Sequence, residues 1–305
     1  MNEAVLDNSR ISKHLGQVSE YKSVYDPRLL VNEPRASNRA HINVSDDDLP
    51  FVGFDTWNAY EVSGLTDDGL PVAGVAKIVY SCDSKYIVES KSIKLYFNSF
   101  NMHHCGGDAQ SVMKFITTQA ERDLSRLLET EVRVHVEEAC VANHEPTSSE
   151  FGSEYITLEK HLYLDNTTFD RYQEDPQLLQ VGFVKHDFDV KYHSSLLKSN
   201  CRVTSQPDWG DVYIHMRGTA SATPDELSLL RYIVSFRDEC HFHEEICETL
   251  YSRLMNKYVP DELCVTCLYA RRGGIDINPS RASHEHMLPE QLGDIRSLHH
   301  KTSKQ

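Results

Sequence analysis

The clearest periodic pattern in the chain lies in residues 108–128. Apolar residues recur there every three or four positions, the spacing that places them on one face of an α-helix. They are Val112, Phe115, Ile116, Ala120, Leu124, Leu127 and Leu128. Asp108 precedes them, and its carboxylate can accept hydrogen bonds from the free N–H groups of a first helical turn. The pattern predicts a helix over 108–128 with Asp108 as its N-cap.

Strands are predicted where β-branched residues gather or where polar and apolar positions alternate. The run Pro71–Tyr80 is rich in Val and Ile, and Val132–Val136 alternates as a half-buried strand does. The second half of the chain has the same style, with alternation over 212–216 and an apolar run over 263–269.

Two helices are predicted between these last two strands. Thr223 as N-cap, Pro224 at the first helical position and Glu226 as capping-box partner would start the first helix. The second has apolar positions at Ile246, Cys247, Leu250, Tyr251 and Leu254. Strands with helices packed on them indicate an α+β fold with antiparallel sheets. No Gly-x-Gly-x-x-Gly segment follows a strand, so no Rossmann cofactor site is predicted.

A polar segment rich in turn formers, residues 143–154, separates the two halves. We therefore expect two modules, residues 1–142 and 166–305, joined by a linker region over 143–165. Residues 1 to about 50 are polar and mixed, and we expect extended or loop structure there.

Composition narrows the class of protein. The chain has 305 residues, 40% of them hydrophobic and 25% charged, as in soluble globular proteins. No apolar run is long enough to span a bilayer, and the first residues lack the pattern of a signal peptide, so we expect a cytoplasmic protein with reduced thiols. A net charge of −15 argues against nucleic acid as a partner. Local basic pairs at Lys91/Lys94 and Arg271/Arg272 favour a small anionic ligand.

The segment 196–210 contains a thiol and a carboxyl group seven residues apart, Cys201 and Asp208. A thiolate is a strong nucleophile, and a positioned carboxyl group can transfer a proton to the atom under attack. Pro207 and a predicted turn at Trp209-Gly210 would direct the carboxyl group, and burial beside Trp209 would raise the pKa of Asp208. The alternatives are a buried cysteine without chemistry and a simple turn.

Two further segments could bind a purine-like ring. Glu89 lies beside Ser90 and Lys91, and its carboxylate could accept two hydrogen bonds from an amidine-like N–H edge. His243 and Glu244 begin an amphipathic helix and offer a proton donor and a second acceptor. Solvated charges on a surface segment, or helix capping, would explain these residues equally well.

A third segment, residues 269–279, contains Arg271, Arg272, Gly273 and Gly274. The glycines would allow the backbone to approach a phosphate closely, and the guanidinium groups could then bind it. A plain strand-to-turn exit also explains the glycines.

Metal ligands are also numerous. Cys240, His241, His243 and Cys247 lie close together in the sequence, and Cys264 and Cys267 form a second pair. The second pair falls in a predicted strand, where positions three apart point to opposite faces. We expect no metal site, and interpret these residues as core thiols and surface imidazoles.

Taken together, the segments resemble the NADPH-dependent 7-cyano-7-deazaguanine reductases (QueF), the nitrile reductases of queuosine biosynthesis, in their long two-module form. The resemblance runs from about Leu15 to Arg281. Its motifs are Glu-Ser-Lys-Ser-x-Lys-x-Tyr-x-x-Ser-Phe-Asn at 89–101, Ser-Asn-Cys at 199–201, Gln-Pro-Asp-Trp-Gly at 206–210, Phe-His-Glu at 242–244 and Arg-Arg-Gly-Gly-x-Asp-x-Asn-Pro at 271–279.

The resemblance implies roles for individual residues. Cys201 would add to the nitrile carbon to form a thioimide, with Asp208 as proton donor and His243 assisting. The substrate ring would be held by a set of pocket residues, namely Val88, Glu89, Ser90, His243 and Glu244. NADPH would be bound by Ser90, Lys91, Arg272 and Gly273. The family implies two tandem tunnelling-fold modules with helices on one face of antiparallel sheets, a homodimer, a role in tRNA modification and no metal.

Some positions depart from the family pattern. Residues 238–241 and Ser280 differ from it, and the tail 282–305 has no assigned counterpart. Two other functions remain open: a metal-dependent purine or pterin hydrolase of the same fold, and a purine-binding module without catalysis.

Overall fold

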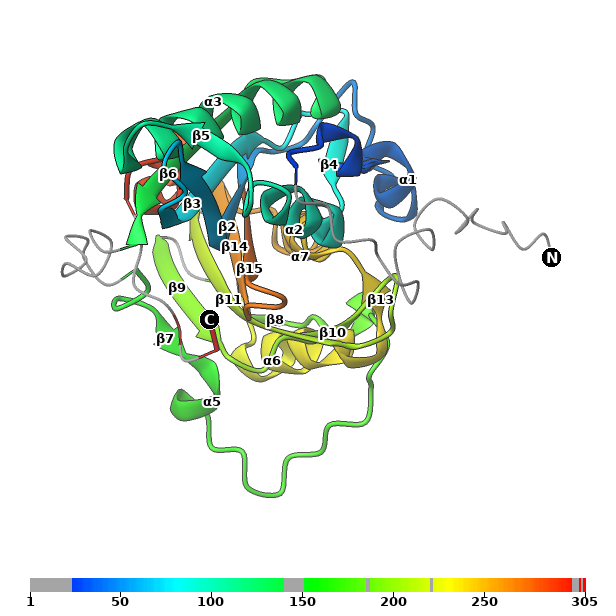
Figure 1. The fold of residues 1–305 in the computed structure, drawn as a ribbon. Coiled ribbons are helices and arrows are strands. Elements are labelled where there is room, and N and C mark those ends of the chain that lie inside the picture. Colours follow the sequence, from blue (N-terminus) through cyan, green and yellow to red (C-terminus); the bar gives the residue numbers. More distant parts are fainter. Residues whose placement is uncertain (1–23, 140–150, 185–186, 220–221, 298–301, 303) are drawn as a thin grey trace.

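The structure, a computed structural model, describes residues 24–139, 151–184, 187–219, 222–297, 302, 304 and 305. It is a mixed α+β fold in which one sheet of 11 strands, mostly antiparallel, packs against the longest helices (Figure 1). None of its helices in these ranges is long and apolar enough to cross a membrane.

The elements follow one another in three groups along the chain. The first half contains β1 (Asn32–Pro34), α1 (Arg35–Arg39), β2 (Val52–Thr66), β3 (Pro71–Ser81), β4 (Tyr86–Val88), α2 (Ser90–Asn98), β5 (His104–Gly106), α3 (Ala109–Leu128) and β6 (Val132–Glu138). The middle contains β7 (Ile156–Thr157), α5 (Leu158–His161), β8 (Val181–Val184), β9 (Phe188–Ser194), β10 (Lys198–Cys201), β11 (Pro207–Gly218) and β12 (Ala222–Pro224). The last group is α6 (Glu226–Val234), β13 (Cys240–His241), α7 (His243–Tyr258), β14 (Glu262–Tyr269), β15 (Ile275–Ala282) and α8 (Glu290–Gly293). Short 3₁₀ helices span Pro27–Leu29, Ala40–Ile42, Pro176–Leu178, Ser235–Asp238 and Glu285–Met287.

The large sheet joins both halves of the chain. Its strand order is β13-β10-β11-β14-β15-β2-β3-β6, with β9 also paired to β11, β7 to β9 and β5 to β2. The junction is the antiparallel pairing of β15 with β2, in which Ile277 lies opposite Trp57. Residues from the end of the chain therefore lie beside residues from its first quarter.

Two hydrophobic cores lie under one face of this sheet. The first is formed by β2, β3 and β6 against α2 and α3, and the second by β9, β11 and β14 against α6 and α7. Ile275 and Ile277 of β15 belong to the first core. Part of the predicted linker belongs to the second, since Leu158 of α5 is fully buried there. The rest of that linker, residues 143–150, lies outside the described residues.

Most predicted elements are confirmed. The helix over 108–128 is α3, and the Asp108 carboxylate accepts a 2.7 Å hydrogen bond from the N–H of Ser111. The predicted strands are β3, β6, β11 and β14, and the second predicted helix is α7.

Three local predictions are wrong. The helix predicted from Thr223 begins two residues later, because Asp225 caps α6 by accepting from the Ser228 N–H at 2.8 Å while Pro224 pairs in β12. Residues 208–210 begin β11 instead of forming a turn, because Gly210 pairs with Tyr269 of β14. The entry segment is also more regular than expected, since residues 24–50 contain β1, α1 and two of the 3₁₀ helices.

The C-terminal tail, to which no counterpart in the family was assigned from the sequence, packs on the face of the sheet opposite the two hydrophobic cores. The Lys77 ammonium group donates to the backbone carbonyls of Asp294 and Ser297, both at 2.6 Å. Thr56 donates to the carbonyl of Leu292 at 2.9 Å. Polar side chains on this face are thus buried with partners, as buried polar groups require.

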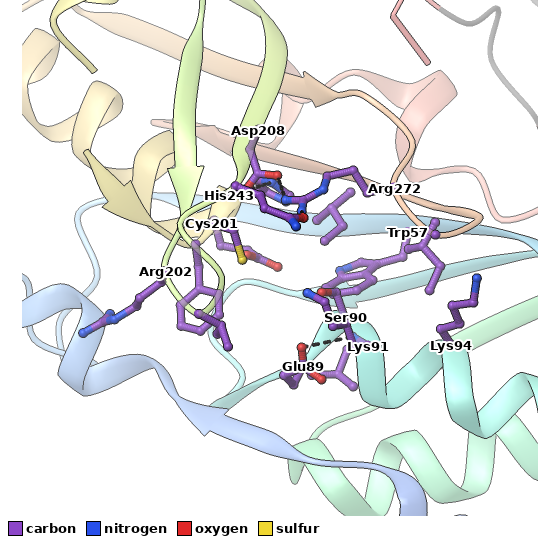
Figure 2. Close-up of a pocket in the computed structure, with 18 of the residues that line it drawn as sticks. Trp57, Glu89, Ser90, Lys91, Lys94, Cys201, Arg202, Asp208, His243 and Arg272 are labelled. Carbon is purple, nitrogen blue, oxygen red and sulfur yellow. Dashed lines mark hydrogen bonds and ion pairs between the residues drawn. The ribbon is translucent and has the colours of Figure 1, made fainter. Parts of the chain in front are cut away.

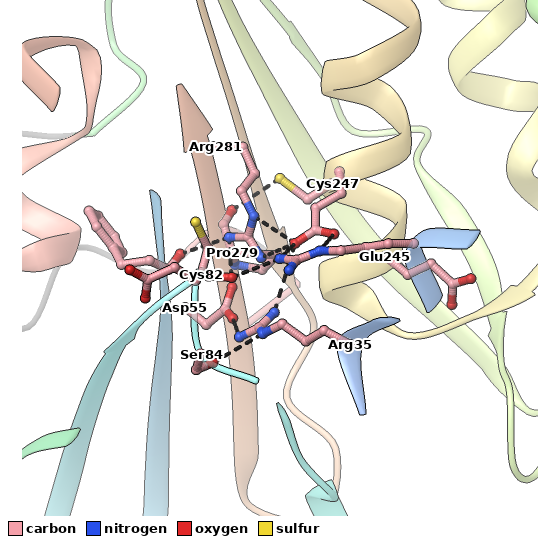
Figure 3. A network of polar contacts seen from close by, with 12 residues as sticks. Arg35, Asp55, Cys82, Ser84, Glu245, Cys247, Pro279 and Arg281 are labelled. Atoms are coloured by element: carbon pink, nitrogen blue, oxygen red, sulfur yellow. Dashed lines mark hydrogen bonds and ion pairs between the residues drawn. The ribbon is translucent and has the colours of Figure 1, made fainter. Parts of the chain in front are cut away.

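A buried ionic network lies where the two cores meet (Figure 3). The Arg281 guanidinium group binds Asp55 at 2.8 Å and Glu248 at 2.9 Å, and Arg35 binds the other oxygen of Asp55. Arg39 binds Glu248 at 2.8 Å. Since these residues come from α1, β2, α7 and β15, the network links both halves of the chain.

Candidate active site

Every residue that the sequence assigned to catalysis or binding lines a single pocket of about 400 Å³. Four segments form its walls: the start of α2, the turn between β10 and β11, the start of α7 and the turn between β14 and β15 (Figure 2). The predicted residues are Val88, Glu89, Ser90, Lys91, Cys201, Asp208, His243, Glu244, Arg272 and Gly273. The sheet brings them together because β15 pairs with β2 and β11 pairs with β14.

Glu89 is the N-cap of α2. One carboxylate oxygen accepts from the Lys91 N–H at 3.0 Å and the other from the Ser92 N–H at 2.7 Å. Each oxygen has a second lone pair, so the carboxylate can still accept from a ligand. Capping therefore holds Glu89 in a fixed orientation at the wall of the pocket.

Cys201 ends β10 at the tight turn that leads to β11. Its N–H donates to the Gln206 carbonyl at 2.8 Å, and its carbonyl accepts from the Ser205 N–H at 2.8 Å. Ser205 has a φ of 54°, a left-handed conformation that closes the turn. In the β10–β11 pairing Ser199 lies opposite Asp208, so the thiol and the carboxyl group come from neighbouring strand ends.

Asp208 is 3% exposed and lies between the side chains of Arg272 and His243. The Arg272 guanidinium group donates to one carboxylate oxygen and His243 Nε2 lies 3.5 Å from the other. Burial acts to raise the pKa of Asp208, but His243 and Arg272 outweigh it and lower the pKa below the usual value. The expected rise is therefore wrong, and Trp209, which is 40% exposed, does not provide the burial.

Glu244 is a buried carboxyl group at the start of α7, 3% exposed. Its Oε1 atom has no hydrogen-bond partner among the described residues. Burial, then repulsion from Asp55, raises the pKa of Glu244 to about 7, against the attraction of His243 and Arg35. A ligand N–H group would satisfy this oxygen and favour its ionised form.

The turn between β14 and β15 forms the outer end of the pocket. Gly273 and Gly274 have φ angles of 58° and 77°, which favour glycine. A Cβ atom on Gly274 would lie 2.6 Å from Glu61, whose carboxylate pairs with Lys94 at 3.0 Å. The turn therefore holds Arg272 close to a second cationic side chain, Lys94. Together these two side chains suit the binding of anionic phosphates.

Two aromatic neighbours of the pocket were not predicted from the sequence. Trp57 lines the pocket from β2 and is 1% exposed, and Tyr269 lies behind His243 with ring centroids 3.8 Å apart. Neither residue belongs to a recognisable local motif. Only the alternation of their strands, combined with the sheet order, could have placed them there.

One group of possible metal ligands occurs among the described residues. His41, His241 and Glu245 have donor atoms within 4.8 Å of one another. His41 Nδ1 and His241 Nδ1 lie 3.4 and 2.9 Å from one carboxylate oxygen of Glu245, and the Arg202 guanidinium group lies 3.4 Å from the other. This arrangement is typical of an ion-pair cluster. Cys264 and Cys267 lie in different hydrophobic clusters on opposite faces of β14, as predicted.

A thiol beside titratable acid–base groups in one pocket is typical of enzymes that use covalent catalysis. Residues 21–136 match the family model described as nitrile reductase, 7-cyano-7-deazaguanine-reductase N-term, and residues 207–287 match that of QueF-like protein. The NADPH-dependent 7-cyano-7-deazaguanine reductase of Dechloromonas aromatica is 39% identical over 282 residues, covering 92% of this chain and 94% of that protein. The protein of the same name from Colwellia psychrerythraea is 39% identical over 287 residues, covering 90% and 93%. The chain belongs to the 7-cyano-7-deazaguanine reductase family.

A solved structure, that of the archaeosine synthase QueF-Like in the apo form, is 16% identical and covers 33% of this chain and 98% of its own. Its TM-score of 0.29 is too low to support a conclusion about the fold.

Proposed function

We propose that the protein reduces the nitrile of 7-cyano-7-deazaguanine to the aminomethyl group of 7-aminomethyl-7-deazaguanine, with NADPH, in queuosine biosynthesis and hence tRNA modification. The observation that carries this proposal is the single pocket in which Cys201 lies with the Asp208–His243 pair and with two carboxylates able to bind a purine-like edge. The names of the relatives state the same substrate and cofactor.

Addition of the Cys201 thiol to the nitrile needs no proton other than the one that the thiol carries. The sulfur of Cys201 bonds to the nitrile carbon, one carbon–nitrogen π bond breaks, and the thiol proton ends on the nitrogen. Asp208 is suited to move this proton because its lowered pKa keeps it ionised and able to accept from the thiol. Once protonated, it donates to the developing negative charge on nitrogen. The product is a thioimide on Cys201, a better electrophile than the nitrile.

Bound NADPH supplies hydride, and the reduction of a nitrile to an amine takes four electrons, hence two cofactor molecules. Cys201 leaves as a thiolate after the first reduction, so an imine remains in the pocket. His243, within 3.5 Å of Asp208, then brings the proton that the nitrogen needs.

Ring recognition falls to Glu89 and Glu244, with Val88, Ser90 and His243 as further contacts. The unpartnered oxygen of Glu244 supports this role, because a ring N–H group would remove an otherwise uncompensated buried acceptor. For the cofactor, Ser90 and Lys91 at the start of α2 lie across the pocket from Arg272 (Figure 2), and Gly273 also lines it. The cationic side chains of Lys91 and Arg272 suit a pyrophosphate.

The proposal includes the larger architecture. We expect two tandem tunnelling-fold modules, residues 1–142 and 166–305 with the linker region 143–165, in a cytoplasmic homodimer without metal, nucleic acid or membrane partners. The two cores under one sheet support two modules.

The function is tested by incubating the protein with 7-cyano-7-deazaguanine and seeking an adduct on Cys201 by mass spectrometry. NADPH is then added and the cofactor oxidised per amine formed is counted. We expect an adduct, two NADPH per amine, and neither with Cys201→Ser. Cys240→Ala is the matched control, because Cys240 is an exposed thiol on β13, beside β10. Binding without an adduct or turnover would identify a non-catalytic purine-binding module instead.

A further inference from the structure

The imidazole of His243 rests on the ring of Tyr269. The two rings are stacked, with centroids 3.8 Å apart and planes 27° apart. Tyr269 is 1% exposed and belongs to the second core, so its ring is held firmly from the other side. Its hydroxyl group has no hydrogen-bond partner among the described residues, so the contact depends on the ring.

Gly210 provides the space for this arrangement. In the pairing of β11 with β14, Gly210 lies directly opposite Tyr269. A Cβ atom at position 210 would lie 3.2 Å from both Cδ1 and Cε1 of the Tyr269 ring, closer than side chains normally pack. Asp208 lies two residues earlier on the same strand and therefore on the same face. The pairing of β11 with β14 thus positions both the Asp208 carboxyl group and the Tyr269 ring on which the His243 imidazole is stacked.

His243 needs such support because few polar contacts fix its imidazole. It is the first residue of α7, its Nε2 atom has no hydrogen-bond partner among the described residues, and it lies 3.5 Å from the Asp208 carboxylate. Without a hydrogen bond at Nε2, the imidazole could rotate away from Asp208. Stacked aromatic rings restrict that rotation.

We propose that Tyr269 is a positioning residue for the reductase, and that Gly210 serves the same purpose by letting the Tyr269 ring lie against His243. This inference rests on the proposed function, since it assigns Tyr269 to the proton transfer between His243, Asp208 and the substrate nitrogen. It also explains why the Gln-Pro-Asp-Trp-Gly motif has a glycine at position 210.

The test compares Tyr269→Phe, Tyr269→Leu and Gly210→Ala in steady-state reduction, with thermal unfolding as a check of folding. Tyr269→Phe keeps the ring and should keep kcat. Tyr269→Leu should lower kcat by about 10²-fold with little change in KM, the loss expected when a catalytic group is misplaced by about 1 Å. Gly210→Ala should lower kcat in the same way, and the double variant Gly210→Ala/Tyr269→Leu should lose little more than Tyr269→Leu, because both changes act on one contact.

The inference is overturned if folded Tyr269→Leu retains the kcat of Tyr269→Phe, or if only KM changes. Should Tyr269→Leu fail to fold, Gly210→Ala decides: an unchanged kcat overturns the inference and a lowered kcat supports it. Absence of NADPH oxidation in the unmodified protein would instead refute the proposed function, so the two failures are distinguishable.

Discussion

Arg272 donates to the carboxylate of Asp208 across the pocket, although 64 residues separate them in sequence. This contact and the nearby His243 keep the pKa of Asp208 below its usual value despite burial. In the proposed reaction Asp208 would therefore receive the thiol proton of Cys201 as a carboxylate. The contact also joins a residue assigned to the cofactor with one assigned to the proton transfer.

Removal of the guanidinium group should raise the pKa of Asp208. As a proton acceptor Asp208 works above its pKa, so adduct formation falls as the pH drops through that value. In Arg272→Gln this acidic limb should move to higher pH, with His243 as the remaining neighbour that lowers the pKa of the carboxyl group. The rate of adduct formation without NADPH, measured from about pH 2 to 8 so that the range extends below the usual aspartate value of about 3.9, tests this.

The matched control for this experiment is Arg271→Gln. Arg271 stacks on Tyr60, with its Cζ atom 3.3 Å from the ring centroid, and within the described part of the chain it forms no hydrogen bond or ion pair with Asp208. A limb that stays in place in Arg272→Gln, or moves to lower pH, contradicts the prediction.

Asp208→Asn should slow adduct formation by about 10² to 10⁴-fold, the usual range for loss of a proton-transfer group. The amide keeps the shape but can neither accept the thiol proton nor return it. Asp211→Asn, a buried carboxylate on the same strand that binds His193 at 3.1 Å, is the control. The pH dependence should also lose its acidic limb in Asp208→Asn, and a profile identical to that of the unmodified protein would exclude the role.

These relationships show where sequence-based prediction succeeds and where it ends. The pocket residues were predictable because their motifs place several chemically specific side chains within a few positions. The strand at Asp208–Gly210 was not, because its partner Tyr269 lies on a distant strand. The direction of the pKa shift of Asp208 was missed for the same reason, since Arg272 reaches it only through the fold. Trp57 is buried at the pocket by the β2–β15 register and has no local signature.

Glu244→Gln should stabilise the protein above pH 7 while weakening substrate binding. Burial and Asp55 raise the pKa of Glu244 to about 7, so in the folded state its ionisation is unfavourable. That cost is absent below about pH 4.5, grows as the pH rises towards 7 and is then constant. We expect the variant to be more stable by roughly 1–3 kcal/mol at pH 8 and by little at pH 4.5.

Urea unfolding at both pH values measures this difference in stability. In the steady-state assay, the KM of Glu244→Gln for the nitrile substrate should rise at least about tenfold, because an amide cannot replace a carboxylate that accepts two N–H bonds. The groups that face Glu244 are Asp55, Arg35 and His243, and none of them is altered by the substitution. Equal stability of the two proteins at pH 8 would refute the assigned pKa direction.

Chelation should leave the reductase activity unchanged. The His41–His241–Glu245 group is paired within itself and with the Arg202 guanidinium group, whose positive charge opposes a bound zinc ion. Dialysis against a chelator followed by metal analysis and assay tests this. If activity were lost on chelation and returned with added zinc, the result would support the alternative function, a metal-dependent hydrolase.

Arg281→Met should destabilise the protein by about 3–5 kcal/mol, the usual effect of removing one partner from a buried ion pair. Arg281 is fully buried, and without it Asp55 and Glu248 each lose a cationic partner and keep Arg35 as the cation near both (Figure 3). Arg217→Met is the control, because the Arg217 side chain is 42% exposed and its pairing with Asp189 at 2.9 Å should contribute at most about 1 kcal/mol. The pKa values of Asp55 and Glu248 are lowered, with Arg281 among the causes, so the stabilisation is present above their usual values and is lost as the pH falls through the lowered ones. Urea unfolding should therefore show a gap between Arg281→Met and the unmodified protein that is largest near neutral pH and narrows in acid. Similar midpoints for Arg281→Met and Arg217→Met at neutral pH would show that the network does not hold the two halves together.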